Sequence, residues 1–175
     1  IVAKTKAMLA TGVDVVKIGF FGGAGHEACI QGLSELTKSG AKLIAVLLAD
    51  SAIDLSVLNK LAKAGFYGVM LDTHQKNGQH LLSYCTLPEL ADFVSKAQSL
   101  GLRSGLAGSL SKAHVDVLLS IGPSYLGFRG ALCDQSKRTA TLDSGRVQEL
   151  AEMLHRDEAE EVALRFVNQT SCALI

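Results

Sequence analysis

The stretch Val69-Met70-Leu71-Asp72-Thr73-His74-Gln75-Lys76-Asn77-Gly78 decides how the rest of the chain is interpreted. It begins as a short apolar strand and ends in the turn pair Asn77-Gly78. A carboxylate, Asp72, closes the strand, and an amine, Lys76, follows four residues later. Parallel α/β proteins place their chemistry in this position, because the strand is rigid and the loop beyond it varies freely. The stretch therefore predicts a functional site, unless Asp72 only caps a turn and Lys76 is solvated.

Strand-like and helix-like segments alternate on both sides of this stretch. The predicted strands are Val13–Phe21, Lys42–Ala49, Gly68–Leu71, Arg103–Ala107 and Tyr125–Phe128. The predicted helices are 1–11, His26–Lys38, Asp54–Ala64, Pro88–Leu100, Lys112–Ser120 and Ser144–Leu154, and a further helix is possible in the tail from Arg156. Near-continuous apolar strands, with glycines closing most of the helices, indicate a parallel sheet covered by helices.

The regular spacing of the strand ends predicts a TIM (β/α)8-type barrel. Eight units of this size would make the ~250 residues of a typical barrel, so we expect this chain to carry about the last five βα units. Residues 1–175 are then a single domain that lacks the three N-terminal strands of the barrel. The alternative is a five-stranded open doubly wound sheet that is complete as it stands.

Composition excludes several classes of partner. The chain has 175 residues, 48% of them hydrophobic and 19% charged, and its net charge is zero. A neutral chain gives no reason to expect nucleic acid or an anionic membrane as partner. No apolar run reaches the ~18 residues of a membrane span, and Ile1-Val2-Ala3-Lys4 does not resemble a signal peptide.

Cysteine and histidine spacing argues against a metal site. The four cysteines and five histidines are Cys29, Cys85, Cys133, Cys172, His26, His74, His80, His114 and His155. None of them forms a CxxC or HExxH pattern, so we expect no metal and no disulfide framework. Scattered thiols suit a cytoplasmic protein with reduced, buried cysteines.

Lys17 is unusual because it interrupts an apolar strand, between Val16 and Ile18. A lysine is almost never fully buried without a partner. If Lys17 points into a barrel, burial and nearby cations would lower its pKa and allow it to act as a base or nucleophile. The alternative is an edge strand on which Lys17 is exposed and blunts aggregation.

Charged residues and glycines follow several strands. Asp50, Asp72 and Arg129 each close a strand and, with Lys17 and Lys76, would share one rim. Such a set suits proton transfer on a carbonyl substrate that carries phosphate. Gly108-Ser109 and Gly130-Ala131 follow the last two strands, where barrels commonly bind phosphate through backbone N–H groups. The loop 22–25 is glycine-rich as well and could serve a second phosphate, although each glycine is also explained as a turn or helix cap.

Four ordered stretches resemble a known family. They are Gly12–Gly22, Met70–Gly78, Gly105–Leu110 and Tyr125–Cys133. Together they are similar to the signature stretches of the (5-formylfuran-3-yl)methyl phosphate synthase family of methanofuran biosynthesis. The resemblance runs from Gly12 to about Val147.

The resemblance implies a (β/α)8 barrel lyase that condenses two molecules of glyceraldehyde 3-phosphate into a furan aldehyde phosphate. Phosphate and water are released, and no cofactor or metal is implied. Lys17 matches the family's proton-accepting lysine, and Asp72 and Lys76 match its acid–lysine pair. Asp50, Gly108, Ser109, Arg129, Gly130 and Ala131 are the residues expected to bind the substrate and its phosphates.

One feature of the family is missing from this sequence. The lysine that forms the Schiff base lies in an Asp-x-Lys-Asn-Pro-type stretch, and this chain has none. A five-stranded piece would leave the strands Val13–Phe21 and Tyr125–Phe128 as unpaired edges. We therefore expect a partner copy in a homo-oligomer, a swapped element or the remaining barrel to cover them. Two alternatives stay open: another class I aldolase-like lyase on phosphorylated sugars, and a non-catalytic phosphate-binding or metabolite-binding barrel.

Overall fold

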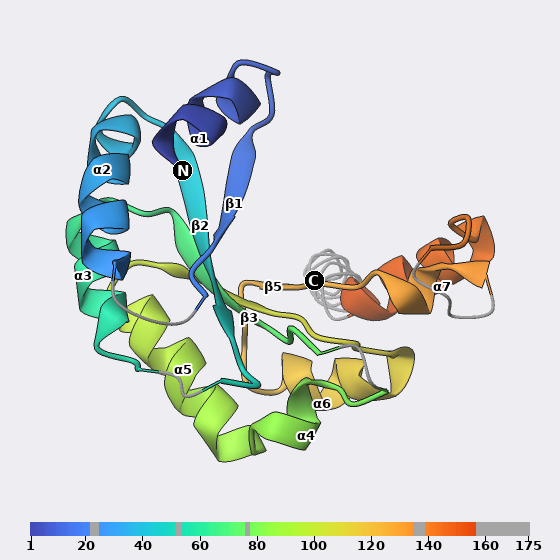
Figure 1. Ribbon diagram of the computed structural model, residues 1–175. Helices are drawn as coiled ribbons and strands as arrows, with labels where there is room; N and C mark the ends of the chain where they lie inside the picture. Colours follow the sequence, from blue (N-terminus) through green and yellow to red (C-terminus); the bar gives the residue numbers. More distant parts are fainter. Residues whose placement is uncertain (22–24, 52–53, 76–77, 135–138, 157–175) are drawn as a thin grey trace, which may run out of the picture.

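The computed structural model describes residues 1–21, 25–51, 54–75, 78–134 and 139–156 (Figure 1). The elements in chain order are α1 (Val2–Leu9), β1 (Val15–Gly19), α2 (His26–Lys38), β2 (Lys42–Leu48), α3 (Val57–Lys63), β3 (Gly68–Asp72), α4 (Leu81–Tyr84), α5 (Leu87–Ser99), β4 (Arg103–Leu106), the 3₁₀ helix η1 (Lys112–His114), α6 (Val115–Leu119), β5 (Tyr125–Leu126), the 3₁₀ helix η2 (Gly130–Leu132) and α7 (Ser144–Leu154).

The strands form one parallel sheet whose spatial order, β1-β2-β3-β4-β5, follows the chain. Lys17 lies opposite Ile44, and Met70 lies opposite Val46 on one side and Gly105 on the other. A doubly wound sheet reverses its strand order at a switch point, so this order excludes that alternative. Strands that advance one place at a time, each followed by a helix, have the arrangement of a (β/α) barrel.

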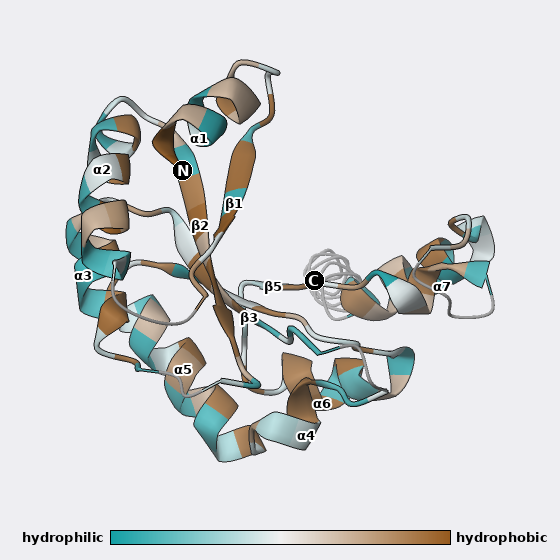
Figure 2. Cartoon of the chain, in the orientation of Figure 1, coloured by the Kyte–Doolittle hydropathy of each residue, from teal (hydrophilic) through white to brown (hydrophobic). Residues whose placement is uncertain are grey.

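One face of the sheet, here called the outer face, lies against α2, α3 and α5 (Figure 1). The main core lies between these layers. It includes Val16, Leu43, Leu58, Val69 and Phe93, all buried. Figure 2 shows β1 and β2 as largely hydrophobic strands, while the helices carry hydrophilic residues on parts of their surface. The predicted sheet covered by helices is therefore confirmed.

Helix α5 illustrates how local sequence and core formation agree. The Thr86 hydroxyl accepts a hydrogen bond from the backbone N–H of Glu89, whose carboxylate accepts one from the backbone N–H of Thr86 in return. This reciprocal capping satisfies N–H groups that a helix start leaves without partners. Leu90, Phe93, Val94 and Ala97 then recur at helical spacing, and all are buried. Capping and periodicity therefore direct one stripe of α5 onto the sheet.

The opposite face, here called the inner face, is composed differently. Its small apolar cluster contains Ile44, Met70 and Ala107. The ring of Tyr125 lies over Gly105, where an added Cβ would come within 2.2 Å of the tyrosine Cζ. The Nζ of Lys17 lies 5.8 Å from the centroid of the same ring. Because β1 and β5 are the two edge strands of the described sheet, this contact shows that the sheet curves strongly around its inner face.

Most element boundaries agree with the sequence prediction, with a few differences. The strand expected at Tyr125–Phe128 is limited to Tyr125–Leu126, and the short helices α4 and η2 were not predicted. The region expected as one helix over Lys112–Ser120 is divided into η1 and α6. Most of the glycine-rich loop, residues 22–24, and the tail beyond Arg156 lie outside the described residues.

Candidate functional site

A cleft with a volume of about 1100 Å³ lies on the inner face and at the carboxyl ends of the strands. Its lining includes predicted site residues from four strands or the loops that follow them, namely Lys17, Asp72, Gly108, Ser109, Arg129, Gly130 and Ala131. Strand ends of a parallel sheet meet at one edge, which explains why residues so distant in sequence share this space. The cleft is therefore the candidate functional site.

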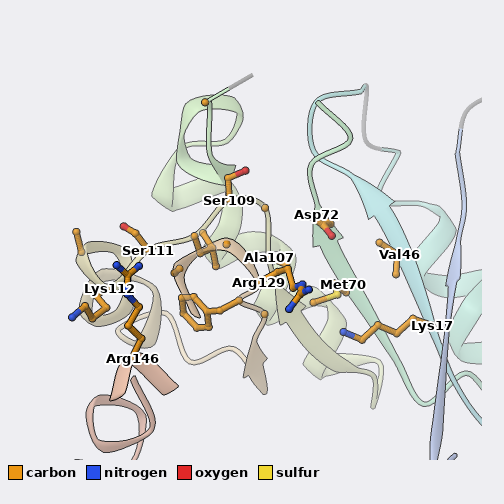
Figure 3. Close-up of a pocket in the computed structure, with 18 of the residues that line it drawn as sticks. Lys17, Val46, Met70, Asp72, Ala107, Ser109, Ser111, Lys112, Arg129 and Arg146 are labelled. Atoms are coloured by element: carbon orange, nitrogen blue, oxygen red, sulfur yellow. The ribbon is translucent and has the colours of Figure 1, made fainter. Parts of the chain in front are cut away.

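Two cations reach into the cleft from opposite ends of the sheet. Figure 3 shows Lys17 and Arg129 extending toward each other across Met70, with the Asp72 carboxylate above them in the view. Both cationic side chains are exposed. Lys17 thus combines features of both sequence interpretations, because it lies on an outer strand and is exposed, yet it points into the cleft. Two adjacent cations favour an anionic ligand.

Asp72 ends β3 at the rim of the cleft and is half-buried. One of its carboxylate oxygens accepts a hydrogen bond of 2.7 Å from the backbone N–H of Thr73. This bond orients the carboxylate, as the capping interpretation requires, while Asp72 still faces the cleft. Lys76, its predicted partner, lies outside the described residues.

The loop after β4 has a demanding backbone. Gly108 has a φ of 115°, and an added Cβ would come within 2.8 Å of the Thr73 Cγ2, so this position requires glycine. Ser109 follows with a φ of 50°, which is uncommon for a residue with a side chain. Such conformations concentrate at functional sites. The Gly108 carbonyl accepts a hydrogen bond of 3.0 Å from the Leu81 N–H, which ties this loop to α4.

The loop after β5 leads directly into η2. The N–H of Cys133 donates to the Gly130 carbonyl at 3.0 Å, and the Cys133 thiol donates to the Arg129 carbonyl at 3.2 Å. These bonds turn the chain sharply, so that Arg129, Gly130 and Ala131 all line the cleft. Glycine loops after the last two described strands therefore border the same space, as expected for a phosphate site.

Asp50 lies outside the cleft lining, and its contacts fit a structural role. Its two carboxylate oxygens accept hydrogen bonds from the backbone N–H groups of His74 and Gln75, at 3.0 and 2.7 Å. Burial alone would raise the pKa of Asp50, but these backbone hydrogen bonds outweigh it and leave the pKa below its usual value. Asp50 thus connects the loop after β2 to the loop after β3 and is not among the residues that line the cleft, so its role in substrate binding stays a prediction.

Sequence reasoning missed several residues of the cleft. Lys112, Ser111, Arg146 and Glu149 also line it. Lys112 forms an ion pair with Glu149, and Arg146 donates to the Cys133 carbonyl at 3.0 Å. These contacts fix α7 beside the loops after β4 and β5. The available signal was the position of Lys112 and Arg146 at the starts of helices that follow those loops.

The described residues contain neither a metal-binding cluster nor a helix that could cross a membrane. Within them, no group of three or more His, Cys, Asp and Glu side chains is arranged to hold a metal ion. Cys29 and Cys85 are free thiols, and Cys172 lies outside the described part. None of the described helices is both long and apolar enough to cross a membrane.

Comparison with known proteins identifies the family. The profile of the 4-HFC-P synthase family matches residues 1–151. This chain belongs to that family. A Methylorubrum extorquens protein assigned as a (5-formylfuran-3-yl)methyl phosphate synthase is 39% identical over 93% of this chain and 67% of its own length. The (5-formylfuran-3-yl)methyl phosphate synthase of Methanocaldococcus jannaschii is 31% identical over 82% of this chain and 66% of its own length.

This member of the 4-HFC-P synthase family thus spans about two thirds of the length of the relatives it matches. Its fold also resembles the phosphoribosyl anthranilate isomerase of Thermus thermophilus, with a TM-score of 0.56 and 12% identity, over 89% of this chain and 66% of that one. That likeness supports the barrel type of fold. Every residue that lines the cleft lies within the family match.

Proposed function

We propose that this chain carries the phosphate-binding and proton-transfer part of a (5-formylfuran-3-yl)methyl phosphate synthase. The reaction would be the Schiff-base condensation of two glyceraldehyde 3-phosphate molecules into a furan aldehyde phosphate, a lyase step of methanofuran biosynthesis. One observation carries the proposal beyond family membership. The cleft joins Lys17, Asp72 and Arg129 to the glycine loops after β4 and β5, at the edge where barrels perform chemistry.

Each group has a role that the chemistry requires. An imine between an amine and the first triose phosphate would acidify the neighbouring carbon, and a base must then remove a proton. Lys17 would serve as this base, and its exposed side chain within the cleft supports the assignment. Asp72 and Lys76 would transfer protons during the elimination of water. Arg129 can bind phosphate in a bidentate manner, and the N–H groups around Gly108-Ser109 and Gly130-Ala131 can add hydrogen bonds.

The finer description of the fold belongs to the same proposal. The five described βα units would be the last five of a barrel, in agreement with their sequential order and with the longer relatives. The described strands β1 and β5 each pair on one side only, so further strands or a second copy would cover their free edges. The imine-forming lysine of the family would come from a stretch that this sequence does not contain.

Borohydride trapping tests the proposal. The chain and the Methanocaldococcus jannaschii relative would each be incubated with glyceraldehyde 3-phosphate and borohydride, then analysed by intact mass and peptide mapping. We expect a covalent adduct in the relative and none on Lys17 in this chain, together with non-covalent substrate binding here. An adduct on Lys17 would contradict its assignment as the base and would favour another class I aldolase-like lyase.

A non-catalytic phosphate-binding or metabolite-binding barrel is the second candidate. Arg129 and the two glycine loops line the cleft, and this arrangement could bind phosphate without any covalent step. It predicts substrate binding without covalent capture in either protein. Two results together would exclude this candidate. The first is covalent trapping in the relative. The second is a loss of proton exchange at the substrate carbon, both in Lys17→Met of this chain and in the corresponding lysine variant of the relative.

A further inference from the structure

The segment Gly108–Ser111 borders the cleft with all four of its residues, and the proposed function gives its backbone the task of binding phosphate. Its conformation is not one that a free chain would adopt, because Gly108 and Ser109 both have positive φ angles. A backbone in such a conformation persists only when its surroundings hold it. The contacts that hold this segment are therefore part of the binding site.

His114 contacts the end of this segment directly. Its Nδ1 accepts a hydrogen bond of 3.0 Å from the backbone N–H of Ser111, and the Ser111 hydroxyl lies 3.3 Å from the same nitrogen. The N–H of His114 in turn donates to the Ser111 carbonyl at 3.0 Å. Both backbone polar groups of Ser111 are thus bound by one residue, which determines where the segment turns into η1.

A second histidine reaches the same place from another part of the chain. The rings of His80 and His114 have centroids 4.3 Å apart and planes inclined by 41°. His80 immediately precedes Leu81, whose N–H donates to the Gly108 carbonyl. Its own N–H donates to the Ser83 hydroxyl at 3.2 Å, which fixes the start of α4. The start of α4 therefore contacts both ends of Gly108–Ser111, one through Leu81 and the other through its N-cap residue His80 and His114.

Protonation states agree with this arrangement. A ring nitrogen accepts a hydrogen bond only when it carries no proton, so the contact with Ser111 requires the Nε2–H form of His114. Burial, and then the proximity of His80, lower the pKa of His114 and favour its neutral ring. Charged neighbours on η1 and α6 are paired elsewhere, Lys112 with Glu149 and Asp116 with Arg156.

The role of His80 is packing. Its Nδ1 is buried and has no hydrogen-bond partner among the described residues. A polar atom left in this state costs stability, so hydrogen bonding does not explain the position of the ring. The position of the His80 ring is explained by its flat surface, which packs against the ring of His114.

We propose that His114 is a positioning residue that holds the Gly108–Ser111 backbone in its anion-binding conformation, and that the ring of His80 holds His114 in place. The proposal rests on the proposed function only in assigning phosphate to this loop. A simple helix cap would stabilise η1 and α6 without affecting the cleft. The two interpretations differ in their consequences for phosphate affinity.

The test compares four variants of the full chain. His114→Leu removes the acceptor, whereas His114→Asn retains an oxygen near the position of Nδ1. His80→Ala removes the packing surface, whereas His80→Phe retains a flat ring. Affinity for inorganic phosphate would be measured by calorimetry at pH 7.5, and protection of the Ser111 amide by hydrogen exchange with NMR detection. His74→Asn, which alters an exposed histidine in the loop after β3, serves as the matched control.

We expect His114→Leu to weaken phosphate binding by about tenfold and His80→Ala by about threefold, as the loss or loosening of one buried hydrogen bond predicts. His114→Asn and His80→Phe should bind within about twofold of the parent, because each preserves the interaction that its counterpart removes. Protection of the Ser111 amide should follow the same order. Equal affinity and equal protection in His114→Leu and the parent, both folded, would overturn the proposal.

The experiment distinguishes failure of the proposed function from failure of the positioning role. If the parent chain bound no phosphate at all, the assignment of the loop would be wrong. The hydrogen-exchange series would still report whether His114 and His80 hold the segment, since it requires no ligand. If phosphate affinity fell equally in His114→Leu and His114→Asn, the acceptor would not be the feature that matters, and the positioning role would be rejected.

Discussion

The two faces of the sheet differ in composition and purpose. On the outer face, residues such as Val16, Leu43 and Val69 alternate along the strands into a core that the helices cover. On the inner face, β1, β4 and β5 carry Lys17, Gly105 and Tyr125, with a much smaller apolar cluster. Alternate residues of one strand therefore serve either stability or the cleft, because successive side chains point to opposite faces.

A few buried polar side-chain atoms have no hydrogen-bond partner among the described residues. The hydroxyl of Tyr125 is buried without a hydrogen-bond partner among the described residues, and burial raises the pKa of this tyrosine to about 12. On the outer side, the Nε2 of His26 in α2, whose ring contacts Phe20 of the main core, is also buried without a partner among the described residues. Unfavourable features such as an unpartnered buried hydroxyl and the positive φ of Ser109 are typical of functional sites. Substitutions on the two faces should separate these purposes.

The largest effect is expected on the outer face. Phe93 in α5 is 1% exposed and packs in the main core. Phe93→Ala should lower the free energy of unfolding by about 3–5 kcal/mol, because it leaves a large cavity. Urea denaturation followed by circular dichroism measures this change. Val147→Ala on α7, at a largely exposed position, is the control. A loss below about 1 kcal/mol for Phe93→Ala would contradict the assignment of the stability core.

The next effect belongs to the inner face. Arg129→Ala should weaken binding of inorganic phosphate by about 10- to 100-fold, as expected for the loss of charge-assisted hydrogen bonds. The free energy of unfolding should change by no more than about 0.5 kcal/mol, since the side chain is exposed. Calorimetric titration and urea denaturation measure the two quantities. Arg129→Lys, which keeps the charge but not the fork, should recover part of the affinity. Unchanged phosphate binding in Arg129→Ala would remove Arg129 from the site.

The smallest effect is expected at Asp50, a polar residue outside the cleft lining that contributes to stability. Asp50→Asn should lower the free energy of unfolding by about 1 kcal/mol near pH 7, because one backbone N–H loses its carboxylate acceptor. The pKa of Asp50 is lowered in the folded chain. Its contribution is therefore complete above the ordinary aspartate pKa of about 3.9 and disappears as the pH falls through the lowered value.

Urea denaturation from pH 3 to pH 7 would measure this difference between the parent and Asp50→Asn. The difference between the two free energies of unfolding should narrow progressively as the pH falls below about 3.9. A difference that does not change with pH over this range would show that the carboxylate charge is not the origin of the stabilisation.

Much of the fold could be predicted from local pattern. Apolar runs, glycines after helices and the Thr86–Glu89 cap all act over a few residues, so the strands and helices follow from them. The orientation of Lys17 could not be predicted, because alternation along a strand does not say which face the helices will cover. Only the strand order resolved the choice between barrel-type and doubly wound sheets.

The candidate site was predictable in part, for a related reason. Asp50 and Asp72 both close strands and look equivalent in the sequence. They differ in the structure because the loop after β3 brings two N–H groups to Asp50, whereas Asp72 faces the cleft. The contact between His80 and His114 had no sequence signature, since it joins two loops that meet only when the sheet has curved.

Local sequence patterns were enough to predict the alternation of strands and helices, the parallel sheet and the membership of the 4-HFC-P synthase family. These properties depend on periodicity and on short ordered motifs, which a linear chain displays directly. The tertiary structure decided which strand ends share the cleft, that Lys17 and Arg129 face one another, and that Asp50 is turned to backbone groups instead. Those outcomes depend on sheet curvature and on hydrogen bonds between distant loops, which exist only after the chain has packed.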